Sequence, residues 1–210
     1  MRRRFTPALA FNLLTPLYDR VNDFLGFGKP FMRRVVELAN VTGDERVLDV
    51  GCGTGSLLLE MISQNPCLDF VGMDPDQKTL QIAKSKFKWA EVGGRLVQGA
   101  AQELLFLTGS LDLVTSTLIF HHLPTRVKLL AIKEIHRVLR DGGRFVLADF
   151  GKPKSVTTEV LIRLGSIFDG TENMKANLEG NLPVYLSESG FQVSEVGERY
   201  KGIQFLLAIK

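Results

Sequence analysis

Short apolar runs alternate with longer stretches of helical periodicity from position 46 onward. This alternation is typical of a parallel β-sheet built from βαβ units. The predicted strands span residues 46–50, 69–73, 95–98, 111–116 and 144–150. Helices are predicted between them at residues 56–63, 77–89 and 126–139.

The helix predicted at residues 126–139 has an amphipathic pattern. Ala131, Ile135 and Val138 recur at i, i+4 and i+7, which places them on one helix face and predicts that this face is buried. Thr125 can cap the start of the helix, and Gly142 can follow its end.

The C-terminal part contains two β-like runs that lie close together in the sequence. Residues 191–197 and 204–208 are joined by a polar turn around Tyr200, Lys201 and Gly202, which predicts a closing antiparallel hairpin. Together with the five earlier strands, this predicts an α/β fold. The expected architecture is a three-layer α/β/α sandwich with a mostly parallel seven-stranded sheet and a C-terminal antiparallel hairpin.

No repeat, low-complexity tract or linker divides the chain, so we expect a single domain over residues 1–210. Residues 1–45 are expected to form a helical cap or lid, ahead of a core over residues 46–210. Residues 152–183 are expected to form a second helical or irregular insertion. Both segments can cover the carboxyl ends of the strands, where open α/β sheets bind their ligands.

Composition and charge are those of an ordinary soluble globular domain. Of the 210 residues, 45% are hydrophobic and 23% are charged, and the net charge of +3 is too small to argue for a nucleic-acid partner. The basic excess is local and weak, and it lies in Arg2, Arg3, Arg4, Arg20, Lys29, Arg33 and Arg34. The sequence has neither a signal-peptide pattern nor about 18 consecutive apolar residues, so we expect no stable membrane insertion.

The two cysteines, Cys52 and Cys67, are too few for a disulfide framework and lack the C-x-x-C spacing of a metal site. This cysteine usage favours a reducing, cytoplasmic setting. We expect a monomer or a homodimer.

The strongest chemical signal is the run VLDVGCGTG at residues 47–55, an apolar strand that ends in a glycine-rich turn and opens a helix. Gly51, Gly53 and Gly55 alternate with other residues, so the backbone can turn tightly and approach a ligand without a Cβ in the way. Asp49 precedes the first glycine by two residues. Ser56 stands where a dinucleotide-binding fingerprint requires a glycine, which disfavours a nicotinamide cofactor.

A second acid, Asp74, ends the next predicted strand. A carboxylate accepts two hydrogen bonds at once, so Asp74 can hold the two vicinal hydroxyls of a ribose. Its alternative role is that of a helix N-cap, but Asp76, directly before Gln77, suits that role better.

The run DVGCGTG after an apolar strand resembles the first motif of class I S-adenosylmethionine-dependent methyltransferases, which have a Rossmann-like fold. The resemblance implies that Gly51, Cys52, Gly53 and Gly55 lie against the methionine and ribose portions of the cofactor, S-adenosyl-L-methionine. It also implies that Asp49 holds the amino end of that cofactor.

The segment after the third predicted strand matches the adenine edge of the family's site, with one departure. Family members usually have Asp or Asn where this chain has Ala100. The backbone N–H of Ala101 and the side-chain amide of Gln102 are the expected replacements. Pro75, directly after the ribose acid, is an expected apolar neighbour of the adenine.

The resemblance also places the end of the fourth strand opposite the transferred methyl group, so Ser116, Thr117 and Leu118 are expected to line the sulfonium end of the cofactor. His121 and His122 follow. Because imidazole titrates near neutrality, either one is a candidate general base, and a packing role is the alternative for both.

Asp149, near the end of the fifth predicted strand, is a third candidate base. Adjacent histidines such as His121 and His122 point in different directions, and no third ligand lies nearby in the sequence. We therefore expect no metal site.

The run YDRVND at residues 18–23 and the runs LRDGGRF and ADFGKP at residues 139–145 and 148–153 are similar to the ubiquinone/menaquinone biosynthesis methyltransferase group. In that group the N-terminal segment forms part of a lid over the cofactor. Tyr18 is therefore an expected cofactor contact, and its alternative role is to anchor the first helix.

The sequence thus predicts a methyltransferase that acts on a small-molecule acceptor, including quinone-like and other aromatic or lipophilic metabolites. A catalytically silent S-adenosylmethionine-binding regulator is the first alternative, and Ala100 favours it. An NAD-dependent oxidoreductase is the second, and both Ser56 and the terminal hairpin count against it.

Overall fold

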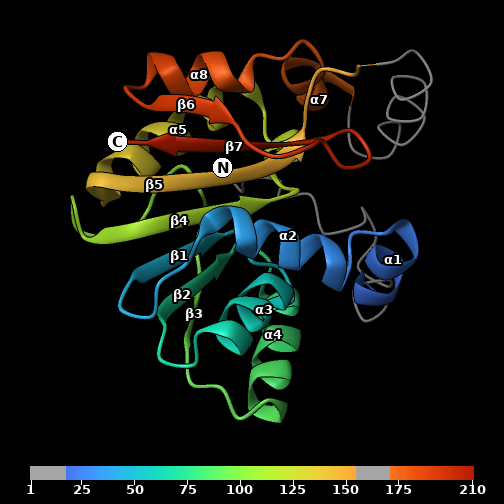
Figure 1. Ribbon diagram of the computed structural model, residues 1–210, viewed down its shortest axis with the longest axis vertical. Coiled ribbons are helices and arrows are strands. Elements are labelled where there is room, and N and C mark those ends of the chain that lie inside the picture. Colours follow the sequence, from blue (N-terminus) through green and yellow to red (C-terminus); the bar gives the residue numbers. More distant parts are fainter. Residues whose placement is uncertain (1–17, 155–170) are drawn as a thin grey trace, which may run out of the picture.

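A seven-stranded sheet forms the centre of the computed structural model, which describes residues 18–154 and 171–210 (Figure 1). The strands are β1 (Arg46–Val50), β2 (Asp69–Asp74), β3 (Arg95–Gln98), β4 (Leu111–Thr117), β5 (Leu139–Phe150), β6 (Gln192–Glu195) and β7 (Ile203–Ile209). The helices are α1 (Tyr18–Leu25), α2 (Lys29–Ala39), α3 (Ser56–Gln64), α4 (Gln77–Trp89), α5 (Thr125–Val138), α7 (Thr171–Leu178) and α8 (Leu182–Glu188), with a 3₁₀ turn η3 (Phe120–His122).

The strand order is β3-β2-β1-β4-β5-β7-β6. Strands β1 to β5 run parallel to one another, whereas β7 runs antiparallel to both β5 and β6. The chain reverses its direction of winding between β1 and β4, so their carboxyl ends border the crevice where such sheets bind ligands. The predicted fold class, a mostly parallel sheet closed by an antiparallel hairpin, is confirmed.

Two apolar clusters hold the helices on opposite faces of the sheet (Figure 1). Helices α2, α3 and α4 cover one face, and α5 and α8 cover the other. Ala131, Ile135 and Val138 of α5 are all fully buried, which confirms the helix face that the sequence predicts. None of the helices in the described ranges is both long and apolar enough to cross a membrane.

The ends of α5 differ from the sequence prediction. Thr125 is the first helical residue rather than its cap, because Pro124 occupies the N-cap position. The helix ends at Val138, since the buried Leu139 is extended and pairs with Leu111 in the sheet. Gly142 instead adopts a left-handed conformation, with a φ of 73°, inside β5.

Helix α2 is an integral part of one layer of the sandwich. Its residue Phe31 is fully buried, and its ring lies 5.8 Å from the ring of Tyr200 and 6.0 Å from that of Phe205. This packing ties the N-terminal segment to the C-terminal hairpin. The single-domain boundary stays a prediction, and residues 1–17 and 155–170 lie outside the described part.

Truncation of Phe31 should be costly, because the surrounding aromatic rings cannot collapse into the space that it leaves. We expect Phe31→Ala to lower the free energy of unfolding by about 3–5 kcal/mol in urea denaturation. Leu107→Ala is the control, since Leu107 is 81% exposed and its loss should change stability by less than about 0.5 kcal/mol. Equal losses in the two variants would contradict this packing.

Candidate cofactor site and catalytic residues

The glycine turn after β1 adopts a conformation that side chains other than glycine rarely allow. Gly51, Gly53 and Gly55 have φ values of 76°, 53° and 75°, in the left-handed region. A Cβ on Gly51 would lie 2.5 Å from Cγ2 of Ile119, and one on Gly55 would lie 2.7 Å from Cε1 of Phe87. A side chain at Gly51 or Gly55 would therefore clash with a neighbouring residue and also strain the backbone.

Asp49 lies beneath this turn and is almost completely buried. Its Oδ1 accepts a hydrogen bond from Oγ1 of Thr115 at 2.8 Å, but within the described part of the chain nothing donates to its Oδ2. Burial raises the pKa of Asp49 to about 7, and the nearby carboxylate of Asp74 adds to this effect. A buried carboxylate oxygen without a partner fits a cationic group of a ligand.

Asp74 joins the glycine turn to the end of β2. Its Oδ2 accepts from the backbone N–H of Gly53 at 2.9 Å, and its Oδ1 accepts from the N–H of Asp76 at 2.8 Å and from Oγ1 of Thr79 at 3.2 Å. Burial raises its pKa. Asp76, in turn, caps α4 by accepting from the N–H of Lys78, as the sequence predicts.

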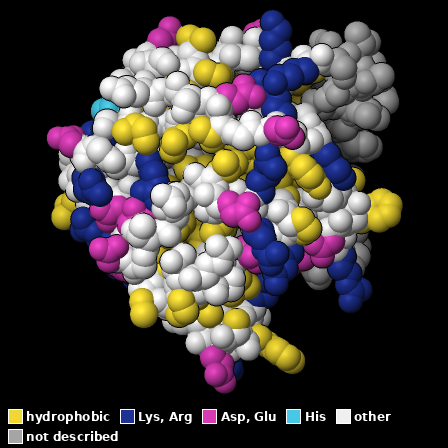
Figure 2. Space-filling model, in the orientation of Figure 1, with side chains coloured by type: hydrophobic (Ala, Val, Ile, Leu, Met, Phe, Trp, Pro, Cys, Tyr) yellow, Lys and Arg dark blue, Asp and Glu magenta, His cyan; other side chains and the backbone are white. Residues whose placement is uncertain are grey.

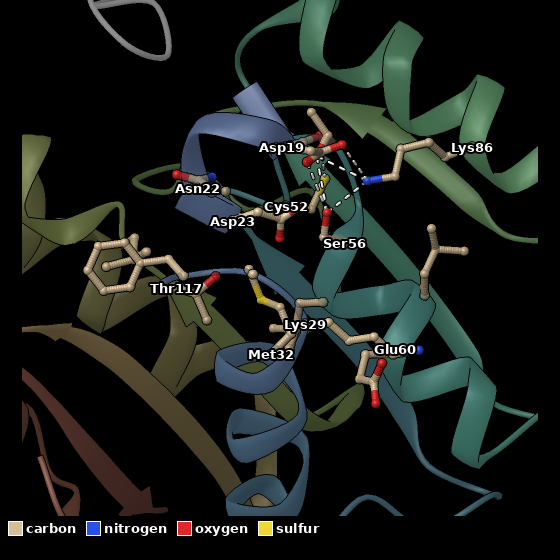
Figure 3. A pocket seen from close by; sticks show the side chains of 18 of the residues that line it. Asp19, Asn22, Asp23, Lys29, Met32, Cys52, Ser56, Glu60, Lys86 and Thr117 are labelled. Carbon is tan, nitrogen blue, oxygen red and sulfur yellow. Dashed lines mark hydrogen bonds and ion pairs between the residues drawn. The ribbon is translucent and has the colours of Figure 1, made fainter. Parts of the chain in front are cut away.

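A cavity of about 360 Å³ opens beside the glycine turn (Figure 3). Five of the predicted cofactor contacts line it, namely Gly51, Cys52, Gly53, Thr117 and Leu118. Outside its lining lie Asp49, Gly55, Asp74, Pro75, Ala101, Gln102 and Ser116. The cofactor roles of all these residues stay predictions.

Some of the predicted contacts that lie outside the cavity lining have structural partners of their own. The Ser116 hydroxyl donates to the carbonyl oxygen of Val50 at 2.8 Å, so it links β4 to β1. Ala101 is buried in the core, whereas Pro75 is exposed where β2 ends. Tyr18 is the first residue of α1, and its side chain lies outside the described residues.

Polar residues that the sequence analysis did not single out line the same cavity from α1 and α4 (Figure 3). Asp19 accepts hydrogen bonds from Oγ1 of Thr54 at 2.6 Å and from Oγ of Ser56 at 3.1 Å, and pairs with Nζ of Lys86 at 2.9 Å. Although burial raises its pKa, the hydrogen bonds from Thr54 and Lys86 outweigh burial and hold that pKa below its usual value. These contacts bring α1 against the glycine turn.

Leu118 marks the point where β4 ends at the cavity. It is a non-glycine residue with a φ of 56°, and its backbone N–H donates to the carbonyl oxygen of Ala148 at 2.9 Å. A leucine in this region carries roughly 1–3 kcal/mol of strain, which surrounding structure must hold. Such strain is typical of residues that line a functional site.

His121 and Asp149 come together although they lie on different elements. Nδ1 of His121 lies 2.9 Å from Oδ1 of Asp149, and both side chains are buried. Asp149 also accepts from the backbone N–H of Phe120 at 2.7 Å, from that of Phe150 at 2.8 Å and from Nδ2 of Asn177 at 3.1 Å.

Asp149 is consequently held as a charged acceptor. Burial by itself raises its pKa, but the charge and hydrogen bond of His121 and the other donors lower it below its usual value. An ionised carboxylate surrounded by donors is a weak base. The role of Asp149 as a base stays a prediction.

His122 lies against His121, with 3.9 Å between the ring centroids. Burial, with a contribution from His121, lowers the pKa of His122 to about 3. A histidine with so low a pKa is a weak base at neutral pH. The catalytic roles of His121 and His122 stay predictions. In the described ranges, no group of three or more His, Cys, Asp or Glu residues is placed to hold a metal ion.

Comparison with known proteins agrees with this geometry. Residues 47–143 match the family described as a methyltransferase domain. The chain is 33% identical over 148 residues to a ubiquinone/menaquinone biosynthesis C-methyltransferase of Geobacter sp. (strain M21), with 68% of this chain and 62% of the relative aligned. A demethylmenaquinone methyltransferase of Thermus thermophilus is 34% identical over 145 residues, with 68% and 65% aligned.

Solved structures show the same fold at lower identity. A methyltransferase from Methanococcus maripaludis has a TM-score of 0.71 at 17% identity and covers all of this chain and 96% of its own. An S-adenosylmethionine-dependent methyltransferase from Aquifex aeolicus has a TM-score of 0.68 at 17% identity, with 85% and 88% covered.

The chain spans slightly less than two thirds of the length of the two curated relatives named above. Residues 47–143, slightly less than half of the chain, thus match a methyltransferase domain, and the chain is similar to a ubiquinone/menaquinone biosynthesis C-methyltransferase and to a demethylmenaquinone methyltransferase.

Proposed function

We propose that this chain transfers a methyl group from S-adenosylmethionine to a small aromatic or lipophilic acceptor, of which a quinone-like ring is the leading candidate. The observation that carries the proposal is the buried, unpartnered Oδ2 of Asp49 beneath the glycine turn. The similarity to a ubiquinone/menaquinone biosynthesis C-methyltransferase and to a demethylmenaquinone methyltransferase supports the choice of acceptor.

The residues present fit this cofactor. Asp49 would bind its amino end, the glycine turn at Gly51 and Gly53 would lie against its methionine and ribose portions, and Asp74 would accept hydrogen bonds from the ribose hydroxyls. Pro75 and the Ala101 backbone would flank the adenine. When bound, the cofactor supplies an electrophilic methyl group on a positively charged sulfur.

The protein contributes mainly alignment and exclusion of water. Thr117 and the strained Leu118 border the cavity where β4 ends, so they would fix the position of the methyl group relative to the acceptor. Holding two reactants in line is worth about 7–11 kcal/mol in favourable cases. This contribution needs no ionisable residue.

His121 would act as the general base for an acceptor hydroxyl or ring carbon. Because Asp149 is ionised, Nδ1 of His121 donates to it, and Nε2 then carries the lone pair that can accept a proton from the acceptor. Asp149 is a positioning residue that fixes the imidazole ring and its tautomer.

A non-catalytic S-adenosylmethionine-binding regulator is the alternative, favoured by Ala100 in place of the usual adenine-edge acid. Turnover separates the two functions. The enzyme should convert the cofactor to S-adenosylhomocysteine in the presence of hydroquinones or phenols, and the product should gain about 14 Da, the mass of one CH₂. Cofactor binding without turnover on any acceptor of a broad panel would favour the regulator.

Asp49→Asn should stabilise the fold and weaken the cofactor complex. The pKa of Asp49 in the folded protein, about 7, lies above its ordinary value of 3.8. The free energy of unfolding of the wild type therefore falls as pH rises from about 3.8 to about 7, and it stays lower at higher pH. The stabilisation by Asp49→Asn should therefore be about 2–3 kcal/mol larger at about pH 8 than at about pH 5. Urea unfolding and calorimetric titration with S-adenosylmethionine measure the two effects, and a variant that loses both stability and affinity would contradict the assignment.

Asp74→Ala should weaken S-adenosylmethionine binding at least about tenfold, because it removes charge-assisted hydrogen bonds to the ribose and releases the N–H of Gly53. Asp69→Ala is the matched control, since Asp69 begins the same strand at an exposed site. Calorimetric titration compares the two variants. Unchanged affinity in Asp74→Ala would refute its role.

His121→Ala should lower kcat by about 100-fold with little change in cofactor affinity, since general-base catalysis typically contributes this much. Added imidazole should restore part of the rate, which a purely structural role would not allow. His136→Ala, on α5, is the control and should retain the wild-type rate. A wild-type kcat in His121→Ala would remove this residue from the mechanism and leave the cofactor site unaffected.

A further inference from the structure

Helix α1 has its polar face turned toward the protein. Asp19, Asn22 and Asp23 recur at i, i+3 and i+4 and line the cavity, whereas Arg20 and Phe24, one turn apart, lie on another face. The Phe24 side chain is 90% exposed. A surface helix ordinarily buries its apolar face and exposes its polar one, so the described side chains of α1 show the reverse arrangement.

Apolar and basic groups continue around Phe24. Leu25 is 46% exposed, and Nζ of Lys201 donates to its carbonyl oxygen at 2.7 Å, which holds a positive charge at this end of the helix. Arg20 and Lys29 are also exposed. Lys and Arg side chains form a column on the visible face that runs from the part carrying α7 down to the part carrying α2, beside α1 (Figures 1 and 2).

The charge of the whole chain is distributed in the same way. The first 34 residues contain seven Lys or Arg and two Asp or Glu, a net charge of +5, whereas the remaining residues contain 19 basic and 21 acidic residues, a net charge of −2. Three of these basic residues, Arg2, Arg3 and Arg4, belong to the 17 residues that precede α1. The positive charge of the chain is thus concentrated in its first 34 residues.

We propose that the outward face of α1, defined by Arg20, Phe24 and Leu25, docks on the surface of an anionic lipid bilayer. An exposed aromatic ring enters the interface between headgroups and acyl chains, and neighbouring Lys and Arg residues are attracted to acidic headgroups. Charge alone would suit nucleic acid equally well. The exposed Phe24 and Leu25 favour lipid, because a phosphate backbone offers no apolar partner for them.

Docking in this orientation would place the cavity near the lipid surface, since α1 supplies both the outward face and part of the cavity wall. The proposal goes beyond the methyl-transfer function and does not depend on its acceptor. It can therefore be tested in the absence of turnover.

The test is sedimentation of the full chain with vesicles of phosphatidylcholine containing phosphatidylglycerol, beside vesicles of phosphatidylcholine alone. We expect binding to the anionic vesicles that falls as salt is raised. Phe24→Ser should weaken it about tenfold, and Arg20→Gln about fivefold. Both side chains are exposed, so thermal unfolding of these variants should match that of the wild type.

Trp89→Ser and Lys88→Gln are the matched controls. Trp89 is 91% exposed and is the last residue of α4, which leads to β3 at one edge of the sheet. Both control variants should bind vesicles as the wild type does. Failure of the wild type to sediment, or equal losses in Trp89→Ser and Phe24→Ser, would overturn the proposal. Tighter binding to duplex DNA than to anionic vesicles, unaffected by Phe24→Ser, would also overturn it.

Discussion

The site depends on two buried carboxylates at the ends of neighbouring strands. Asp49 and Asp74 lie on β1 and β2, on either side of the glycine turn, and burial raises the pKa of both. Asp74 satisfies its charge with the N–H groups of Gly53 and Asp76, whereas Asp49 keeps one oxygen without a partner. Asp74 therefore clamps the glycine turn, whereas in the proposed function Asp49 receives the cationic group of the ligand.

The rest of the fold places other groups at the same edge. Because β1 and β4 are adjacent and parallel, Thr117 and Leu118 lie beside the glycine turn. His121 follows β4 and Asp149 lies near the end of β5, the next parallel strand, so the proposed base and its proposed positioning residue lie at the same edge. Helix α1 reaches this edge through the contact of Asp19 with Lys86.

Local sequence patterns account for the strands, for the glycine turn and for the cap at Asp76, because each depends on residues that are neighbours in the chain. The end of α5 was mispredicted because Leu139 is recruited by its sheet partner Leu111, a tertiary contact. Similarly, no local signal joins Asp19 to Lys86, which is 67 positions away. The pairing of His121 with Asp149 depends on strand order, which the sequence analysis did not use.

A crystal structure of the protein with S-adenosylhomocysteine bound would test the central claim most directly. The account predicts the ribose hydroxyls within hydrogen-bonding distance of Asp74 and the amino group of the ligand beside Oδ2 of Asp49. A ligand bound at another edge of the sheet, or an amino group directed away from Asp49, would contradict it.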